Sequence, residues 1–222
     1  MINSQSIADQ TAKFIEGLII SGKLTAGQKI KEQEISSMLG ISRFPIREAF
    51  KILEATGLVY REPRRGLFVS RVEEKDIWEI YTLKIGLYTL GVTLAMEKIT
   101  DKDIKKLEKI VRSMEKIAES GDPNISKYQD LNDLFHVTTI DISGHVRLKK
   151  IVEGLNNQIR RLSYKSLSSD NAYLMKSCKY HRLILDAIIM KDTKLAEDLT
   201  REHIVKGLER QKIIKASQEP NQ

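Results

Sequence analysis

Three of the four histidines in this 222-residue chain fall on the apolar faces of expected helices. His136 follows Asn132 by one helical turn, so the imidazole and the amide share a face. His181 precedes Ile184 at helical spacing, and His203 lies on a similar apolar face. Three separate helices are therefore expected to direct one imidazole each toward the core.

Imidazole nitrogens accompanied by one amide oxygen suit a divalent metal ion such as zinc, nickel or manganese. A single inward histidine is more often a core residue with one hydrogen-bond partner than a metal ligand. Three inward histidines, together with an Asn–His pair one turn apart, favour the metal site. A coordination sphere left open would also accept water or a ligand oxygen.

A second candidate group lies in the stretch GISRFPIREAF, where Arg43 and Arg47 are four positions apart around Pro45. The pattern predicts a helix that begins at Ser42, whose hydroxyl is expected to cap the first turn, where proline is tolerated. The arginines lie away from the apolar face of this helix, which comprises Ile46, Ala49, Phe50 and Leu53. Arginine can bind guanine O6 and N7 with both arms of its guanidinium, or clamp a phosphate. Ordinary solvated surface arginines are the alternative.

The placement of charge favours an anionic partner for this region. Lys and Arg outnumber Asp and Glu by 37 to 30 in the whole chain, which gives a net charge of +7. The segment from Arg43 to Arg71 alone holds seven basic and three acidic residues. A basic cluster of this kind around a short helix is typical of a nucleic-acid surface.

Composition also indicates a compartment. Cys178 is the only cysteine, so no intramolecular disulfide can form, which fits a reducing environment. The N-terminal stretch lacks the pattern of a signal peptide, and no segment approaches the roughly 20 apolar residues that a membrane span requires. We therefore expect a cytoplasmic protein with no membrane partner.

Periodicity and turn residues predict a mainly α protein with two domains and a tail. Helices are expected over 7–20, over KEQEISSMLG with Ile35, Met38 and Leu39 inward, and from Ser42. The segment GKLTAGQKI is expected to be a turn, and LVYREPRRGLFVSRV a β-hairpin with its tip at EPRRG. Only helical patterns follow. We predict a winged helix-turn-helix over 1–74, an all-helical antiparallel bundle over 75–214 and a tail over 215–222.

The first region resembles the N-terminal DNA-binding domain of the GntR superfamily of bacterial transcription regulators. Its motif G-x-L-x-P-G, followed by L-G-V-S-R-x-P-V-R-E-A-L and a wing ending in G-x-x-V, is matched over about fifty residues, with Ala26 in place of the usual proline. The resemblance implies binding to double-stranded DNA, chiefly through Arg43 and Arg47. Supporting contacts are implied for Ser42, Phe44, Gln33, Arg65 and Gly66.

The second region is similar to the FCD ligand-binding domain of the FadR-like branch of that superfamily. FHVTTIDISGH and the segment from His181 to His203 follow the order of its motifs. The resemblance implies a divalent metal held by Asn132, His136, His181 and His203, where Asn132 replaces the more usual aspartate.

The helix that is expected to open the second region departs from the family in a further way. Lys84 and Tyr88 stand where the family has R-x-x-x-E, whose arginine often helps to hold an effector carboxylate. We expect these two residues to contact the effector, with Lys84 supplying a point charge rather than a planar fork.

These observations together predict a transcription regulator, not an enzyme. Its operator binding is expected to respond to a small metabolite, a carboxylate held at a metal. A stripe formed by Leu83, Leu87, Leu90 and Leu94 belongs either to the core or to a dimer seam. A homodimer predicts a pseudo-palindromic operator. The alternatives are a metal-dependent enzyme, for which no general base is found beside the histidines, and a repressor that senses metal alone.

Overall fold

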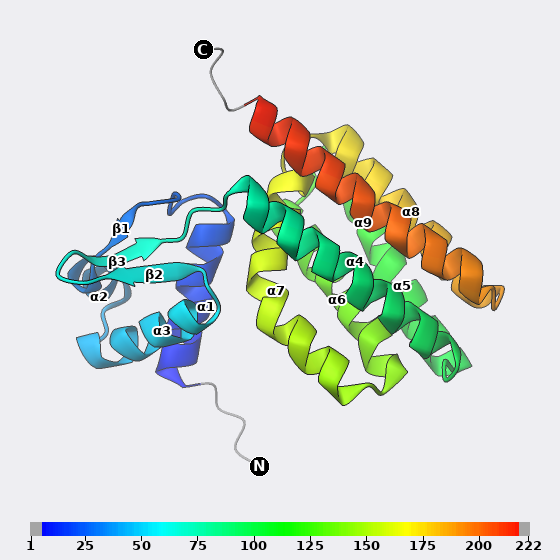
Figure 1. Cartoon of the computed structure of the whole chain (residues 1–222), viewed down its shortest axis with the longest axis horizontal. Helices are drawn as coiled ribbons and strands as arrows, with labels where there is room; N and C mark the ends of the chain where they lie inside the picture. Colours follow the sequence, from blue (N-terminus) through cyan, green and yellow to red (C-terminus); the bar gives the residue numbers. More distant parts are fainter. Residues whose placement is uncertain (1–5, 218–222) are drawn as a thin grey trace. The chain divides into compact units, whose positions relative to one another are not determined.

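The computed structural model describes residues 6–217 and divides into two compact units, Met1–Glu73 and Glu74–Gln222 (Figure 1). Each unit buries a hydrophobic core of its own. The α9 helix continues to Ala216, two residues into the segment that we predicted to be a tail. The rest of that tail, from 218 onward, lies outside the described residues.

The first unit is a winged helix-turn-helix, which confirms the expected fold class. Its elements in chain order are α1 (Ile7–Ile20), β1 (Lys29–Ile30), α2 (Glu32–Leu39), α3 (Arg43–Ala55), β2 (Val59–Glu62) and β3 (Gly66–Val69). The sheet is antiparallel with the order β1-β3-β2. Glu62 pairs with Gly66, which leaves residues 63–65 as the tip of the wing.

The local expectations for β1 and for the inward face of α2 were wrong. The segment predicted to be only a turn contains β1, whose two residues pair with Phe68 and Leu67. A strand of two residues is too short to show the alternation of buried and exposed side chains that identifies a strand in a sequence. Its conformation depends on pairing with β3. Met38 is 61% exposed, because α2 buries only the side of the helix that carries Ile35.

Helix α3 packs against the core of the first unit through the predicted apolar face. Ile46, Ala49, Phe50 and Leu53 are all buried, which leaves the opposite face outward. Ser42 occupies the N-cap position with extended backbone, but its hydroxyl makes no capping hydrogen bond, contrary to our expectation. The direction of the helix therefore depends on packing rather than on this cap.

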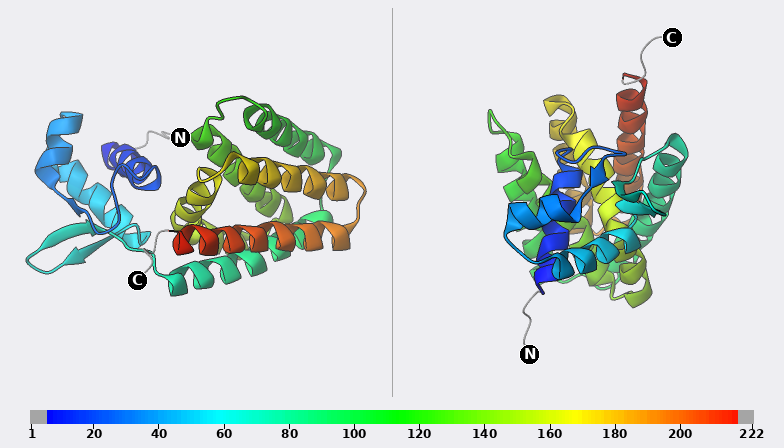
Figure 2. Two further views of the ribbon diagram at one scale, coloured as in Figure 1. Left: turned by 90° about the horizontal axis from the view of Figure 1, so that it is seen from above. Right: turned by 90° about the vertical axis from the view of Figure 1, so that its left-hand side faces the viewer.

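The second unit is a bundle of helices, as predicted. They are α4 (Glu74–Met96), α5 (Asp101–Ala118), α6 (Ile125–Ser143), α7 (Val146–Leu167), α8 (Asn171–Ile189) and α9 (Thr193–Ala216). Turn residues cap three of these helices, since Asn124, Asp170 and Asp192 each accept a hydrogen bond from a first-turn amide. Figure 1 and Figure 2 show α4 and α9 side by side.

The leucine stripe of α4 does not form the core. Leu83 and Leu90 are 50% and 44% exposed, and Leu87 and Leu94 are only partly buried. The opposite side of α4, with Tyr81, Lys84 and Tyr88, is the buried one. The alternative that the stripe belongs to the core is therefore wrong. None of the helices between residues 6 and 217 is long and apolar enough to cross a membrane.

A close approach between α4 and α6 depends on a glycine. A Cβ atom on Gly91 would lie 2.8 Å from Cγ1 of Ile140, far inside van der Waals contact. Gly91 lies one turn beyond Tyr88, and Ile140 lies one turn beyond His136. The glycine therefore helps α4 to bring the Tyr88 ring to 4.7 Å, centroid to centroid, from the His136 ring.

We expect Gly91→Ala to lower the free energy of unfolding by about 1–3 kcal/mol, because the added methyl group overpacks this contact. Chemical denaturation monitored by circular dichroism measures the change. Gly86→Ala is the matched control on the same helix, since nothing lies within 4 Å of its added Cβ. It should stabilise the helix by up to about 1 kcal/mol, and equal effects of the two substitutions would contradict the prediction.

Candidate functional site

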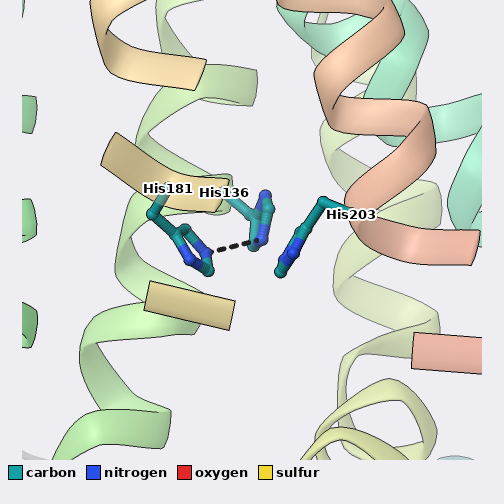
Figure 3. Close-up of side chains that lie close together, drawn as sticks. All are labelled: His136, His181 and His203. Carbon is teal, nitrogen blue, oxygen red and sulfur yellow. Dashed lines mark hydrogen bonds between the residues drawn. The ribbon is translucent and has the colours of Figure 1, made fainter. Parts of the chain in front are cut away.

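Three helices of the second unit bring the three predicted histidines together. His136 comes from α6, His181 from α8 and His203 from α9, and one ring nitrogen of each lies within 4.8 Å of the others. Nε2 of His136 is 3.3 Å from Nε2 of His181, and Figure 3 shows the three rings converging on one point. The rings are at most 6% exposed. The cluster is therefore shielded from bulk water.

Hydrogen bonding defines the protonation of His181. Its Nδ1 lies 2.8 Å from the carbonyl oxygen of Ser177. A carbonyl can only accept, so Nδ1 carries the proton and Nε2 keeps its lone pair. Burial lowers the pKa of His181 to about 4, and burial, followed by the neighbouring positive groups, lowers the pKa values of His136 and His203 well below the usual range. Neutral imidazoles at this spacing fit a divalent metal ion.

Asn132 lies one turn before His136 and is buried. Its amide nitrogen is 3.2 Å from Oδ1 of Asp133, to which it donates, so its carbonyl oxygen is the atom left to accept or to coordinate. Burial raises the pKa of Asp133 to about 6, against the opposing charge of Arg160, whose guanidinium donates to Oδ2 at 3.0 Å. The carboxylate next to Asn132 is thus engaged by Arg160, while Asn132 itself carries no charge.

Lys84 places a buried ammonium group beside the cluster. It is 6% exposed and shares a polar cavity with Asn132 and His203. Nζ donates a hydrogen bond to Oγ of Ser163 at 3.2 Å and lies 5.4 Å from the centroid of the Tyr88 ring. Burial lowers the pKa of Lys84 to about 8, although Asp133 opposes this shift. An ammonium group has three donors, so this environment suits an additional anionic acceptor.

The rest of the cavity is rich in hydroxyl groups that we did not predict. Tyr81, Ser163, Ser166 and Tyr173 line it together with Lys84. A partial signal was available, since Tyr81, Lys84 and Tyr88 share one helical face and Ser163 and Ser166 share another. Which two faces meet is a matter of tertiary packing. The cavity has room for little more than one water molecule.

The predicted DNA-contacting residues of the first unit gather around α2, the start of α3 and the wing. The guanidinium of Arg43 donates to Oε1 of Gln33, and Nε of Arg47 donates to Oε2 of Glu32 at 2.9 Å. Phe44, between the two arginines, is 74% exposed. We did not predict that Glu32 would be the partner of Arg47, although the acidic residues at the start of α2 indicated a possible partner for a nearby arginine.

The wing carries its own basic group. Arg65 pairs with Glu62, and its guanidinium carbon lies 5.7 Å from the centroid of the Phe68 ring. Gly66 has φ of 113°, a conformation that other residues rarely adopt, which is the reason for glycine at this turn. The structure thus brings the predicted wing residues to one hairpin tip, while their contacts with DNA stay a prediction.

Comparison with known families agrees with this two-part arrangement. Residues 7–69 match the family described as bacterial regulatory proteins, gntR family, and residues 79–206 match the FCD domain. The gluconate operon transcriptional repressor of Bacillus subtilis (strain 168) is 30% identical over 80% of this chain and 73% of that protein. A probable D-xylose utilization operon transcriptional repressor of Paenarthrobacter nicotinovorans is 27% identical over 90% and 86%, respectively.

Solved structures share the fold. E. coli McbR/YncC has a TM-score of 0.82 at 20% identity, over 96% of this chain and all of that one. A putative GntR regulator from Rhodococcus sp. RHA1 has a TM-score of 0.76 at 20% identity, over 93% of this chain and 98% of that one.

The neutral amide of Asn132 generates a prediction about metal affinity. We expect Asn132→Asp to raise the affinity of the purified protein for Zn²⁺, Ni²⁺ or Mn²⁺ by at least about tenfold, because a carboxylate adds a charged oxygen donor. Isothermal titration calorimetry after chelation measures the change.

Asn171→Asp is the matched control, because it adds the same charge ten residues before His181 on α8. It should leave metal affinity unchanged.

The double variant His181→Ala, His203→Ala should bind none of these ions in the bundle. If the double variant still bound metal stoichiometrically, the two histidines would not be metal ligands and the proposed site would be wrong.

Proposed function

Since this chain belongs to the GntR family of bacterial regulatory proteins and carries an FCD domain, we propose that its DNA binding is controlled by a small carboxylate bound in that domain. The family makes the chain a DNA-binding transcription regulator and not an enzyme. The control by a carboxylate and the part played by a metal are our proposal. The alternative of a metal-dependent enzyme is therefore wrong.

The observation that carries the proposal is the buried ammonium group of Lys84. A buried cation is costly unless an anion or several acceptors compensate it. The only hydrogen bond of Nζ within the described chain is to Ser163, and the carboxylate of Asp133 is engaged by Arg160. A ligand carboxylate in the cavity would supply the missing acceptor and charge. The hydroxyl groups of Tyr81, Ser166 and Tyr173 would bind further oxygen atoms of such a ligand.

A divalent metal ion bound by His136, His181 and His203, with Asn132 as an oxygen donor, would lie next to this cavity, because Asn132 and His203 also line it. These ligands are all neutral, so the bound ion would keep its full positive charge beside Lys84. The ion would act as a Lewis acid that holds a ligand oxygen. An anionic effector would therefore be stabilised by both the ion and Lys84.

The size of the cavity supports coupling between ligand binding and helix positions. A cavity with room for little more than one water molecule has to expand to admit an organic acid. Lys84 and Tyr88 lie on α4, which begins at Glu74, directly after the first unit. A shift of α4 on ligand binding would change the first unit's freedom to engage DNA, and this differential affinity is what allosteric control requires.

We further propose that the regulator acts as a homodimer on a pseudo-palindromic operator. The exposed leucines of α4, Leu83 and Leu90, provide an apolar surface that a second copy could cover. Two-fold symmetry of the protein would be matched by symmetry of the operator. The relatives named as operon repressors support repression as the direction of control.

Arg47→Ala should weaken binding to a duplex selected from a random library by about 1–3 kcal/mol and relax specificity at one base position. The reason is that Glu32 holds Nε of Arg47, which leaves the two terminal nitrogens for guanine O6 and N7. Fluorescence anisotropy at several salt concentrations measures both effects. Lys51→Ala, on the outer face of the same helix, is the control and should leave the base specificity unchanged at every position of the duplex. Unchanged specificity in the Arg47 variant would contradict base reading.

Lys84→Met should abolish the response of DNA binding to the effector while leaving affinity for the selected duplex unchanged, because the ammonium group is buried in the bundle, where it would bind the ligand and not DNA. The measurement is a DNA-binding titration of full-length protein with a panel of small mono- and dicarboxylic acids, with and without Zn²⁺. Lys75→Met, exposed on the same helix, is the control. A shift caused by metal alone, with no effect of any acid, would identify a metal-sensing repressor instead.

A further inference from the structure

Phe44 is an apolar side chain that lies largely in water within the described chain. It is 74% exposed, more than any other large hydrophobic residue in the part that the structure describes. The remaining apolar residues in the first two turns of α3 are buried, Ile46, Ala49 and Phe50 at no more than 1% exposure. Leaving a phenyl ring in water forgoes the stabilisation that burial provides. Its position therefore indicates a partner outside the chain.

The geometry of α3 places Phe44 at the centre of the outward face. At 100° per residue, Phe44 is opposite the buried side and is followed at i+3 and i+7 by Arg47 and Lys51. Packing of α3 through its apolar face holds this direction. The aromatic ring thus lies in line with the cationic groups that would face the DNA.

Double-stranded DNA offers one apolar group of this kind on the base edges of the major groove, the C5-methyl group of thymine. In a helix-turn-helix, the N-terminal residues of the second helix reach those edges. Phe44 precedes Arg47 by about 4.5 Å along the helix axis, at about 1.5 Å per residue, and base pairs are about 3.4 Å apart. The two side chains are spaced to reach neighbouring base pairs.

We propose that Phe44 is a specificity-determining residue that contacts the methyl group of a thymine beside the base pair faced by Arg47. The restraint of the adjacent arginines supports this assignment. Gln33 holds Arg43, and Glu32 holds Arg47, so the surroundings of the phenyl ring are ordered by α2 before DNA arrives. A contact made by such an ordered tip discriminates bases at low entropic cost.

The test uses the full-length protein and duplexes selected from a random library. Each thymine of the best duplex is replaced in turn by deoxyuridine, which removes only the methyl group and keeps every hydrogen bond. The wild-type protein should bind about fourfold more weakly when one particular thymine in each half of the operator is replaced. This fold-change corresponds to about 0.8 kcal/mol for one buried methyl group. Fluorescence anisotropy at one fixed salt concentration measures the affinities.

The variant Phe44→Ala, tested on the same thymine and deoxyuridine duplexes, completes a double-mutant cycle between the ring and the methyl group. This variant should bind thymine and deoxyuridine duplexes equally at that position, and repeated selection with it should lose the thymine preference there. Ile52→Ala, which truncates a partly exposed apolar residue two turns further along α3, is the matched control and should keep the fourfold difference. Thermal unfolding by circular dichroism checks that both variants fold.

Two results would overturn the proposal. One is a wild type that is insensitive to deoxyuridine at every position. The other is a Phe44→Ala variant that loses affinity equally for all sequences and keeps the methyl effect, which would place the ring against the sugar-phosphate backbone. Neither result depends on the effector or the metal, so each is separate from the proposed control by a carboxylate.

Discussion

Polar groups that require compensation are buried at the centre of the helical bundle, and the surrounding helices are arranged around them. An ammonium group and three imidazole rings lie in a region that excludes bulk water. Their cost is reduced in three ways: the imidazoles stay neutral, Ser177 accepts from His181, and Ser163 accepts from Lys84. Within the described chain, Nζ of Lys84 has one hydrogen-bond partner, which supports the proposed binding of an anion in this cavity.

The same constraint supports the proposed use of this bundle as a sensor. A rigid apolar core would respond little to a small acid, whereas a cluster short of negative charge gains free energy from one. Helix α4 connects the cluster to the start of the bundle, since it carries Lys84 and Tyr88 and begins at Glu74. The glycine at 91 lets this helix lie close to α6, so a change at the histidines is felt by α4 through direct packing.

The DNA-binding unit shows the opposite use of charge. Its cations lie on the surface, and neighbouring side chains from α2 and the wing orient them: Arg47 by Glu32, Arg43 by Gln33 and Arg65 by Glu62. Exposed ion pairs of this kind add little stability. Their effect is to restrict the directions that the guanidinium groups can take, which supports the proposed contacts with particular base edges.

The sequence by itself determined the class of fold, the helix-turn-helix with its wing, the inward histidines and the outward arginines, because helical spacing and turn residues are local properties of the chain. It failed at β1 and Met38, and it left open whether the leucine stripe of α4 lies in the core, because pairing and packing decide these features. Only the tertiary structure decided that His136 meets His181 across 45 residues, and that Lys84 shares a cavity with His203 and Ser163. The physical reason is that periodicity shows which face of a helix is buried, while long-range packing chooses the helix that lies against it.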